Sequence, residues 1–184
     1  AAARAVRPGI LETEVLAEAE YAMAKAGSMG SSFRMQVLTH SRQLALHPYA
    51  SRTPLEDNGP VVIHLGASCE GYTAKMCRTV FLGNPKPESL RIYEALKGAQ
   101  QAAVKALRPG VTCGEVYAKA AAYIAGQGYE KSWVMEHIGY GVGIRQSEFY
   151  PIISKDSPTI LRENMVVDLL LPTIFIPGAG GPRI

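Results

Sequence analysis

Residues 60–83 read PVVIHLGASCEGYTAKMCRTVFLG, and the rest of the chain is most easily understood from this stretch. It begins with β-branched residues, two glycines enclose a short polar connection, and residues 72–81 are again strand-like, which predicts a β-hairpin. His64 and Lys75 stand one in each strand, where apolar residues would be typical. We therefore expect one face of the hairpin to line a pocket; the simpler alternative is a pair of polar side chains at its rim.

Length and composition limit the class of protein. With 184 residues, of which 47% are apolar and 19% charged, the chain can bury one good core and is not disordered. The net charge of +3 comes without a basic cluster, so we expect no nucleic acid partner. Three cysteines without a CxxC pair favour a reducing compartment. The apolar stretch 165–176 is too short to span a bilayer. We expect a cytoplasmic protein with no membrane partner.

Two segments of the chain repeat each other 101 residues apart. RPG at 7–9 is followed by EV at 14–15, and RPG at 108–110 is followed by EV at 115–116. Each copy predicts a turn followed by an amphipathic helix, and Thr112 gives the second helix a capping box. A period this long is typical of two halves of one domain related by pseudo-symmetry.

The repeat also predicts how the chain is organised. We expect a single domain over residues 1–184, with halves of about 1–83 and 84–184. Each half should contain a helix, the Arg-Pro-Gly turn, a second helix and then strands. By that rule the chain begins inside a helix and stops inside a strand region. We therefore interpret it as a domain truncated at both ends.

The hairpin resembles the first metal motif of the family that contains methionine aminopeptidases, Xaa-Pro peptidases and creatinases. The family pattern is roughly (V/L)-x-x-D-x-G, followed by G-Y-x-x-D-x-x-R-T-x-x-x-G. This chain keeps the scaffold and places His64 and Lys75 where the family has its two aspartates. The resemblance implies an α+β fold of the kind called pita-bread. In that fold two pseudo-symmetric α/β halves surround a curved antiparallel β-sheet.

A second segment of the chain also resembles the family. EHIGYGVG at 136–143 is similar to the family segment H-x-x-G-H-G-x-G. Tyr140 stands at the position of a histidine ligand, and Ser147 at that of another catalytic histidine. Glu148 is retained.

The remaining similar segments lie near the end of the chain. Residues 163–170 are similar to x-G-M-V-x-T-I-E, and Leu170, or Leu171 with one inserted residue, replaces the glutamate ligand. GGPRI at 180–184 is similar to G-G-x-R-I. In a dielectric near 20, a lysine ammonium about 4 Å from a divalent ion repels it by about 8 kcal/mol. Because Lys75 stands at a ligand position, we expect no metal site and no cofactor.

The resemblance implies a metal-independent hydrolase of the creatinase or ectoine hydrolase kind. Such an enzyme cleaves a C–N bond of a small zwitterionic or carboxylate-bearing substrate. His47 lies in a segment that resembles the family's N-x-x-x-P-H stretch, and we predict that it transfers the proton with the assistance of Glu148. Polar side chains would bind the substrate and its carboxylate: His64, Lys75, Tyr140 and Ser147.

Two alternatives remain open at this point. The peptidase-like module of a histone chaperone keeps the fold without the ligands, so the chain could be an inactive domain that binds a peptide or protein. The other alternative is a metallopeptidase of the Xaa-Pro aminopeptidase type. Creatinase-type relatives carry an extra N-terminal domain and form dimers. This implies a homodimer in the full-length protein, with a small molecule or a peptide as its substrate.

Overall fold

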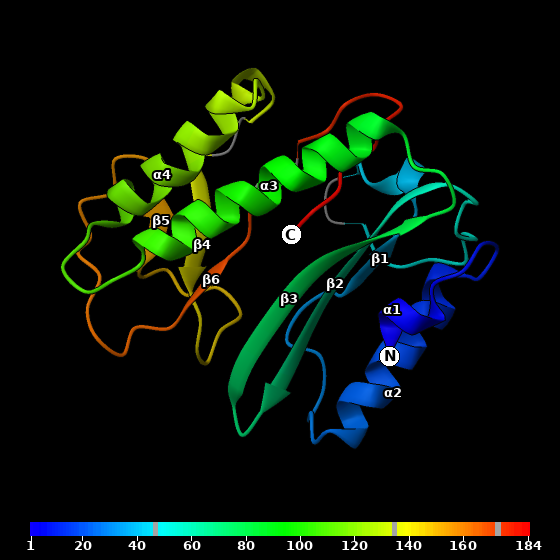
Figure 1. The fold of residues 1–184 in the computed structure, drawn as a ribbon. Helices are drawn as coiled ribbons and strands as arrows, with labels where there is room; N and C mark the ends of the chain where they lie inside the picture. The colour runs from blue at the N-terminus through cyan, green and yellow to red at the C-terminus, as the bar shows by residue number, and fades with distance from the viewer. Residues whose placement is uncertain (46–47, 134–135, 172–173) are drawn as a thin grey trace.

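The computed structural model describes residues 1–45, 48–133, 136–171 and 174–184 (Figure 1). Its helices are α1 (Ala2–Ala5), α2 (Glu12–Lys25), α3 (Pro87–Ala106) and α4 (Cys113–Gly126), with 3₁₀ turns η1 (His40–Arg42) and η2 (Glu130–Ser132). Its strands are β1 (Gln36–Leu38), β2 (Gly59–Cys69), β3 (Tyr72–Leu82), β4 (His137–Gly141), β5 (Ile152–Ser154) and β6 (Val167–Leu169).

The described strands form two antiparallel sheets of three strands each. The first has the order β1-β2-β3, and the second has β4 between β5 and β6. α2 packs against β1, and α4 packs against β5 (Figure 1). The long helix α3 lies beside α4 and spans the distance between the two sheets (Figure 1). Each half thus places its helices on the outside of its own sheet.

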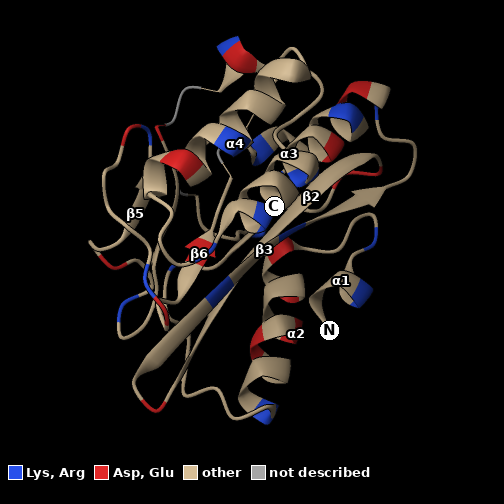
Figure 2. Ribbon diagram, turned by 60° about the vertical axis from the view of Figure 1, so that its left-hand side comes forward, with Lys and Arg blue, Asp and Glu red and all other residues tan. Residues whose placement is uncertain are grey.

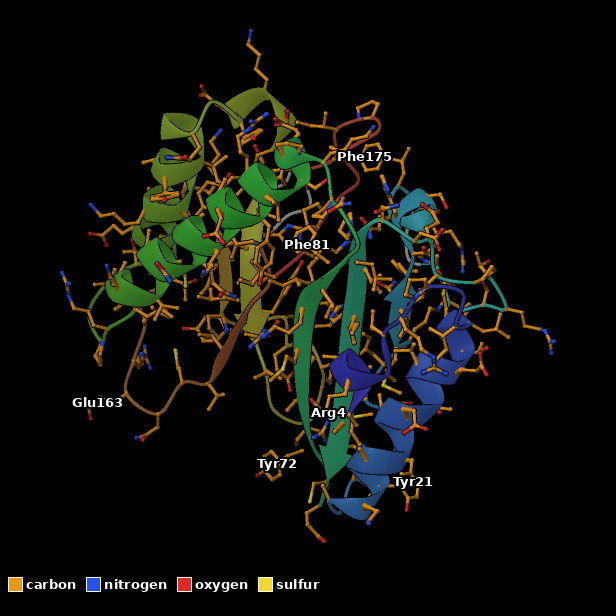
Figure 3. The ribbon with its side chains drawn as sticks, turned by 45° about the vertical axis from the view of Figure 1, so that its right-hand side comes forward. Arg4, Tyr21, Tyr72, Phe81, Glu163 and Phe175 are labelled. Atoms are coloured by element: carbon orange, nitrogen blue, oxygen red, sulfur yellow. The ribbon has the colours of Figure 1, made fainter. Side chains whose placement is uncertain are left out.

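The predicted hairpin is confirmed. β2 and β3 pair along eleven residues each, starting with Gly59 opposite Leu82. Glu70 and Gly71 form the two-residue turn, with φ values of 50° and 83°. Positive φ at both positions is what a tight hairpin turn requires, and glycine adopts it without a steric penalty. Tyr72 projects from the tip of the hairpin into solvent (Figure 3).

The sequence repeat has a counterpart in the hydrogen bonds. α2 and α4 have fourteen residues each and begin 101 residues apart. The backbone N–H of Gly9 donates to Leu55 O, and that of Gly110 donates to Leu161 O, both at 2.9 Å. Both turns after Arg-Pro therefore attach to a later segment of their own half in the same way.

The predicted capping box is confirmed in α4. Glu115 N–H donates to Thr112 Oγ1 at 3.2 Å, and Thr112 N–H donates to Glu115 Oε2 at 2.8 Å. In α2 the cap residue Leu11 has no side-chain acceptor. Only the return bond forms there, from Leu11 N–H to Glu14 Oε2 at 2.8 Å.

Apolar side chains pack into one large cluster in the second half and a smaller one in the first, and Leu38, Val62 and Cys77 form a third. The large cluster joins α3 and α4 to β4 and β5, and the small one joins α2 to β1 and β2. Charged residues are concentrated on helices and loops, whereas β2 and β3 carry few (Figure 2). Among the described helices, none is long and apolar enough to span a bilayer.

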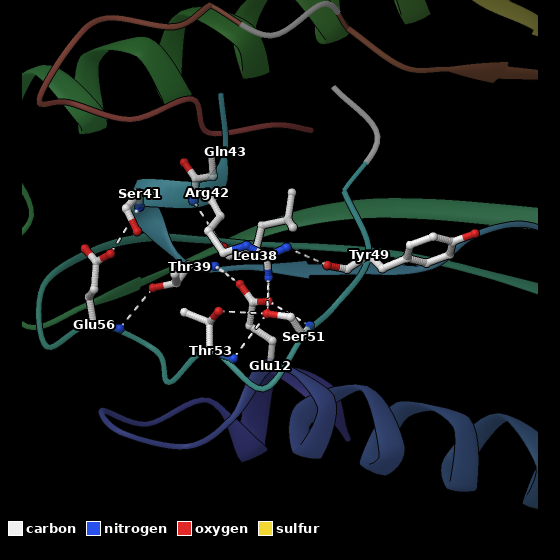
Figure 4. A network of polar contacts seen from close by, with 10 residues as sticks. All are labelled: Glu12, Leu38, Thr39, Ser41, Arg42, Gln43, Tyr49, Ser51, Thr53 and Glu56. Carbon is white, nitrogen blue, oxygen red and sulfur yellow. Dashed lines mark hydrogen bonds and ion pairs between the residues drawn. The ribbon is translucent and has the colours of Figure 1, made fainter. Parts of the chain in front are cut away.

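A buried carboxylate joins α2 to the segment that follows β1 (Figure 4). Glu12 is fully buried and accepts backbone N–H bonds from Thr39 and Ser51, each at 2.9 Å. The Ser51 hydroxyl donates to it at 3.0 Å, and Arg42 forms an ion pair with it. Because these donors come from both sides of residues 40–50, Glu12 fixes the two ends of this connection.

Candidate functional site

A cavity of about 300 Å³ lies where the two halves meet, between β3, β6 and α3. Its walls combine polar and apolar side chains. The lining residues are His64, Lys75, Met76, Cys77, Arg78, Gln100, Val104, Leu107, Val167, Asp168, Leu169, Leu170 and Ile184. The volume is at the lower end of the range that is typical of small-molecule sites.

Lys75 is the central charged group of this region. Its side chain is 4% exposed, although it lies on a strand at the edge of the first sheet. Lys75 Nζ is 3.2 Å from Asp168 Oδ2 and donates to Ser147 Oγ at 2.8 Å. It also lies 5.5 Å from the centroid of the Tyr140 ring, which is within the range of a cation–π contact. β3 of the first half is thus tied to three side chains of the second.

The structure brings together three of the predicted substrate-binding residues. Lys75 contacts both Ser147 and Tyr140. His64 lies opposite Cys77 in the β2–β3 pair, and Cys77 is two residues from Lys75. His64 and Lys75 therefore point to the same face and line the same cavity. The His64 ring also packs on Phe33, with 4.5 Å between ring centroids.

Of the two predicted catalytic residues, the structure describes only Glu148, and its hydrogen bonds are not to this group. His47 lies outside the described residues, so its role stays a prediction. The Glu148 carboxylate accepts the backbone N–H of Arg145 at 2.9 Å, and Glu148 N–H donates to Gly141 O at 2.7 Å. These contacts stabilise its own loop, and the assisting role of Glu148 also stays a prediction.

Asp168 is the functional candidate that the sequence analysis missed. Its carboxylate pairs with Lys75 at the cavity wall. Burial raises the pKa of Asp168 above its ordinary value, and the Lys75 ammonium opposes that rise. The signal was present in the sequence, because Asp168 is the only charged residue in the run VVDLLL at 166–171. A strand with a single acidic side chain needs a partner for it.

Cys77 is unlike a reactive thiol. It is buried, and burial raises its pKa to about 12, while Arg183 and Arg78 act in the opposite direction. The thiol therefore stays protonated at neutral pH and is a poor nucleophile. We assign it to the wall of the cavity rather than to chemistry.

Ser147 is likewise held in an arrangement that does not activate it. A lysine can serve as a general base for serine only when its amine is neutral. Lys75 Nζ is instead engaged in an ion pair with the Asp168 carboxylate at 3.2 Å. Ser147 Oγ therefore accepts a hydrogen bond from Lys75 and keeps its own proton.

The C-terminal segment closes one wall of the cavity. Arg183 donates through Nη1 to Gln36 Oε1 at 3.1 Å and through Nη2 to Gln43 O at 3.0 Å. Thr79 Oγ1 donates to Arg183 O at 2.7 Å and accepts from Arg183 N–H at 2.9 Å. These contacts hold Ile184 at the edge of the cavity.

The two helix-backed sheets and the cavity between them define an α+β protein of the pita-bread class. The model of metallopeptidase family M24 matches residues 1–184, and the chain belongs to this family. It is 35% identical to the Xaa-Pro dipeptidase of Pyrococcus horikoshii over 184 residues, which is 100% of this chain and 52% of that protein. It is 34% identical to the Xaa-Pro dipeptidase of Lactobacillus delbrueckii subsp. lactis over 181 residues, 98% of this chain and 48% of that protein.

Solved structures confirm the predicted pita-bread fold. The prolidase of Pyrococcus horikoshii OT3 matches with a TM-score of 0.93 and 35% identity, over 100% of this chain and 52% of that one. The X-Pro aminopeptidase of Thermotoga maritima MSB8 matches with a TM-score of 0.90 and 32% identity, over 100% and 51%. The chain therefore spans about half the length of these relatives.

The comparisons overturn the expectation of a creatinase-like hydrolase. The similar proteins are Xaa-Pro dipeptidases, and the similarity extends over the whole chain. The sequence interpretation was wrong because it relied on a few substituted positions. The similarity to Xaa-Pro dipeptidases, in contrast, extends along 184 residues.

The name of the family, metallopeptidase, implies a metal. Among the described residues, no group of three or more His, Cys, Asp or Glu side chains is placed to hold a metal ion. At the cavity wall the one carboxylate in the strand β6, Asp168, already faces the Lys75 ammonium. The described residues therefore do not fit a metal centre.

Proposed function

We propose that this chain is a peptide-binding domain of family M24 that does not hydrolyse its ligand. In this proposal the cavity between β3, β6 and α3 holds a short peptide. The family's metal ligands have been replaced by His64, Lys75, Tyr140 and Leu170. The observation that carries the proposal is the contact of Lys75 with Asp168 and Ser147, because it pairs the ammonium of the cavity with its one β6 carboxylate.

Peptide hydrolysis needs either an activated water molecule or an activated nucleophile. Ser147 is not activated, for the reason given above, and the Cys77 thiol is protonated. The cavity nevertheless keeps side chains that suit a peptide. Gln100 and Arg78 can bond to backbone amides and a terminal carboxylate, and Val104, Leu107 and Leu170 offer apolar surface.

The relatives suggest which peptides to test. Because the similar proteins are named Xaa-Pro dipeptidases, we propose dipeptides with proline in the second position as ligands. Binding would be measured by isothermal titration calorimetry with Ala-Pro, and with Pro-Ala as the reversed control. Cleavage would be followed by proton NMR in the same samples. We expect saturable binding of Ala-Pro with no release of free proline.

Two variants of α3 form a matched pair for this experiment. Val104 is an exposed apolar residue that lines the cavity, and Leu90 is an exposed apolar residue of the same helix that does not. Val104→Arg should weaken Ala-Pro binding at least about tenfold, since the long side chain enters the cavity. Leu90→Arg should leave binding unchanged. Equal binding by both variants would place the ligand elsewhere.

Hydrolysis of Xaa-Pro dipeptides is the second candidate function. Its support is the full-chain similarity to proteins named for this activity. It predicts turnover of Ala-Pro that a chelator abolishes. The expected homodimer and cytoplasmic location remain predictions of the full-length protein, and sedimentation velocity tests the first.

A further inference from the structure

Lys75 is surrounded in the way a bound cation is surrounded. Asp168 reaches it from β6, Ser147 from the loop after β4, and the Tyr140 ring from β4 itself. Together they leave its side chain 4% exposed. A strand lysine normally extends to solvent, so this enclosure is a specific arrangement rather than a consequence of its position.

The surroundings also contain more than one potential metal ligand. His64 lies on the same face of the hairpin as Lys75, and Asp168 lies across the cavity. Imidazole and carboxylate are both common ligands of divalent metals. What prevents these two residues from sharing an ion is the ammonium group beside Asp168.

We propose that the Lys75 ammonium is a built-in substitute for a divalent metal ion. It supplies positive charge to the Asp168 carboxylate and joins the two halves of the fold at this point. The inference deepens the proposed function and rests on it for the identity of the cavity as the binding site. Its test, however, uses no peptide, so that the two proposals can fail separately.

The effect of the ammonium on a competing ion is large. At about 4 Å and an effective dielectric near 20, a single positive charge weakens the binding of a divalent ion by roughly a millionfold. A substitution that removes this charge and adds a carboxylate should therefore reverse the preference of the cavity. Lys75→Asp does both, because it leaves His64, the new carboxylate and Asp168 around the same space.

The experiment compares four proteins by equilibrium dialysis against Mn²⁺ and Co²⁺ followed by elemental analysis. The proteins are the wild type, Lys75→Asp, Lys75→Asp/Asp168→Asn and Lys97→Asp. Lys97 lies on α3 with its side chain 45% exposed, so its substitution changes the net charge equally but away from the cavity. Circular dichroism verifies that each variant is folded.

We expect the wild type and Lys97→Asp to retain no stoichiometric ion. Lys75→Asp should bind about one ion per chain, at least about a thousandfold more tightly than the wild type. The additional Asp168→Asn change should weaken that binding about tenfold or more, because it removes a ligand.

Two results would overturn the proposal. One is a wild-type protein that retains one or two ions per chain, and the other is a folded Lys75→Asp variant that binds no more tightly than Lys97→Asp. If Lys75→Asp does not fold, Lys75→Glu replaces it. The ion content of the wild-type protein still tests the proposal by itself, because one or two retained ions per chain would refute it.

Discussion

Replacing Glu12 by alanine should destabilise the protein more than any other single carboxylate change in α2. The Glu12 side chain is fully buried and accepts three hydrogen bonds, from Thr39 N–H, Ser51 N–H and the Ser51 hydroxyl, in addition to its ion pair with Arg42. Alanine removes the acceptor from all of them and leaves buried donors without a partner (Figure 4).

The expected magnitude follows from these contacts. Removing one member of a buried ion pair typically costs about 3–5 kcal/mol, because the other member is left uncompensated. Arg42 is 26% exposed at its side chain and can turn partly to water, which lowers its share. The two backbone N–H groups cannot turn, and each unsatisfied buried donor costs about 1–3 kcal/mol. We therefore expect Glu12→Ala to lower the free energy of unfolding by about 4 kcal/mol.

The assay is urea unfolding followed by circular dichroism, with Glu14→Ala as the matched control. Glu14 lies on the same helix and caps it from an exposed position through Leu11 N–H, so its loss should cost about 1 kcal/mol. Glu12→Gln keeps one oxygen acceptor and should lie between the two. If Glu12→Ala costs no more than Glu14→Ala, the network does not hold the connection at 40–50 in place.

Two further predictions concern the cavity and α3. Lys75→Met should cost about 3 kcal/mol at pH 7, because Asp168 loses its counter-charge, and the double variant Lys75→Met/Asp168→Leu should recover most of this loss in the same urea assay. Burial raises the folded-state pKa of Asp168, so the folded chain holds that proton more tightly than the unfolded chain. Stability therefore falls as pH rises through the raised pKa. The loss of stability in Lys75→Met should accordingly be smaller at pH 4 than at pH 7. Gly98→Ala in α3 should fail to give the usual gain of about 0.5–1 kcal/mol, since the new Cβ would lie 2.2 Å from the Tyr123 ring, whereas Gly126→Ala, which meets nothing within 4 Å, should give it. A Tyr123→Ala background should restore the gain at Gly98. Thermal melts of the wild type, Gly98→Ala, Tyr123→Ala and the double variant test this, and equal effects of Gly98→Ala in both backgrounds would contradict it.

Local patterns account for the parts of the fold that were predicted from the sequence. The hairpin at β2–β3 is encoded by β-branched residues on both sides of a Glu-Gly turn, and the two long helices of the repeat by their shared Arg-Pro-Gly turns. Such signals depend on neighbours in the chain and need no tertiary knowledge. The repeat predicted two related halves, and the pita-bread class followed from the resemblance.

The candidate site was predicted only in part, because its chemistry depends on contacts between distant residues. Lys75, Ser147 and Tyr140 were named as one group, and they do meet. Asp168, however, was not among the predicted site residues, because its pairing with a lysine 93 residues earlier has no local signature. The role of Lys75 as a ligand for substrate carboxylate was assigned without knowing that Asp168 and Ser147 already occupy it.

The contacts of the C-terminal segment have a consequence for how the chain folds during synthesis. Gly181 N–H donates to Gln43 Oε1, and Arg183 bonds to Gln36, Gln43 and Thr79, all of which belong to the first half. These partners are separated by more than 100 residues, so the ribosome completes the first sheet and the rest of the second half before residues 181–183 emerge. Until then Gln36 Oε1 and Gln43 Oε1 lack the donors that Arg183 and Gly181 supply. The first half therefore reaches its final form only after residues 181–183 have been synthesised, and a nascent chain paused near residue 170 should remain open to proteolysis at this point.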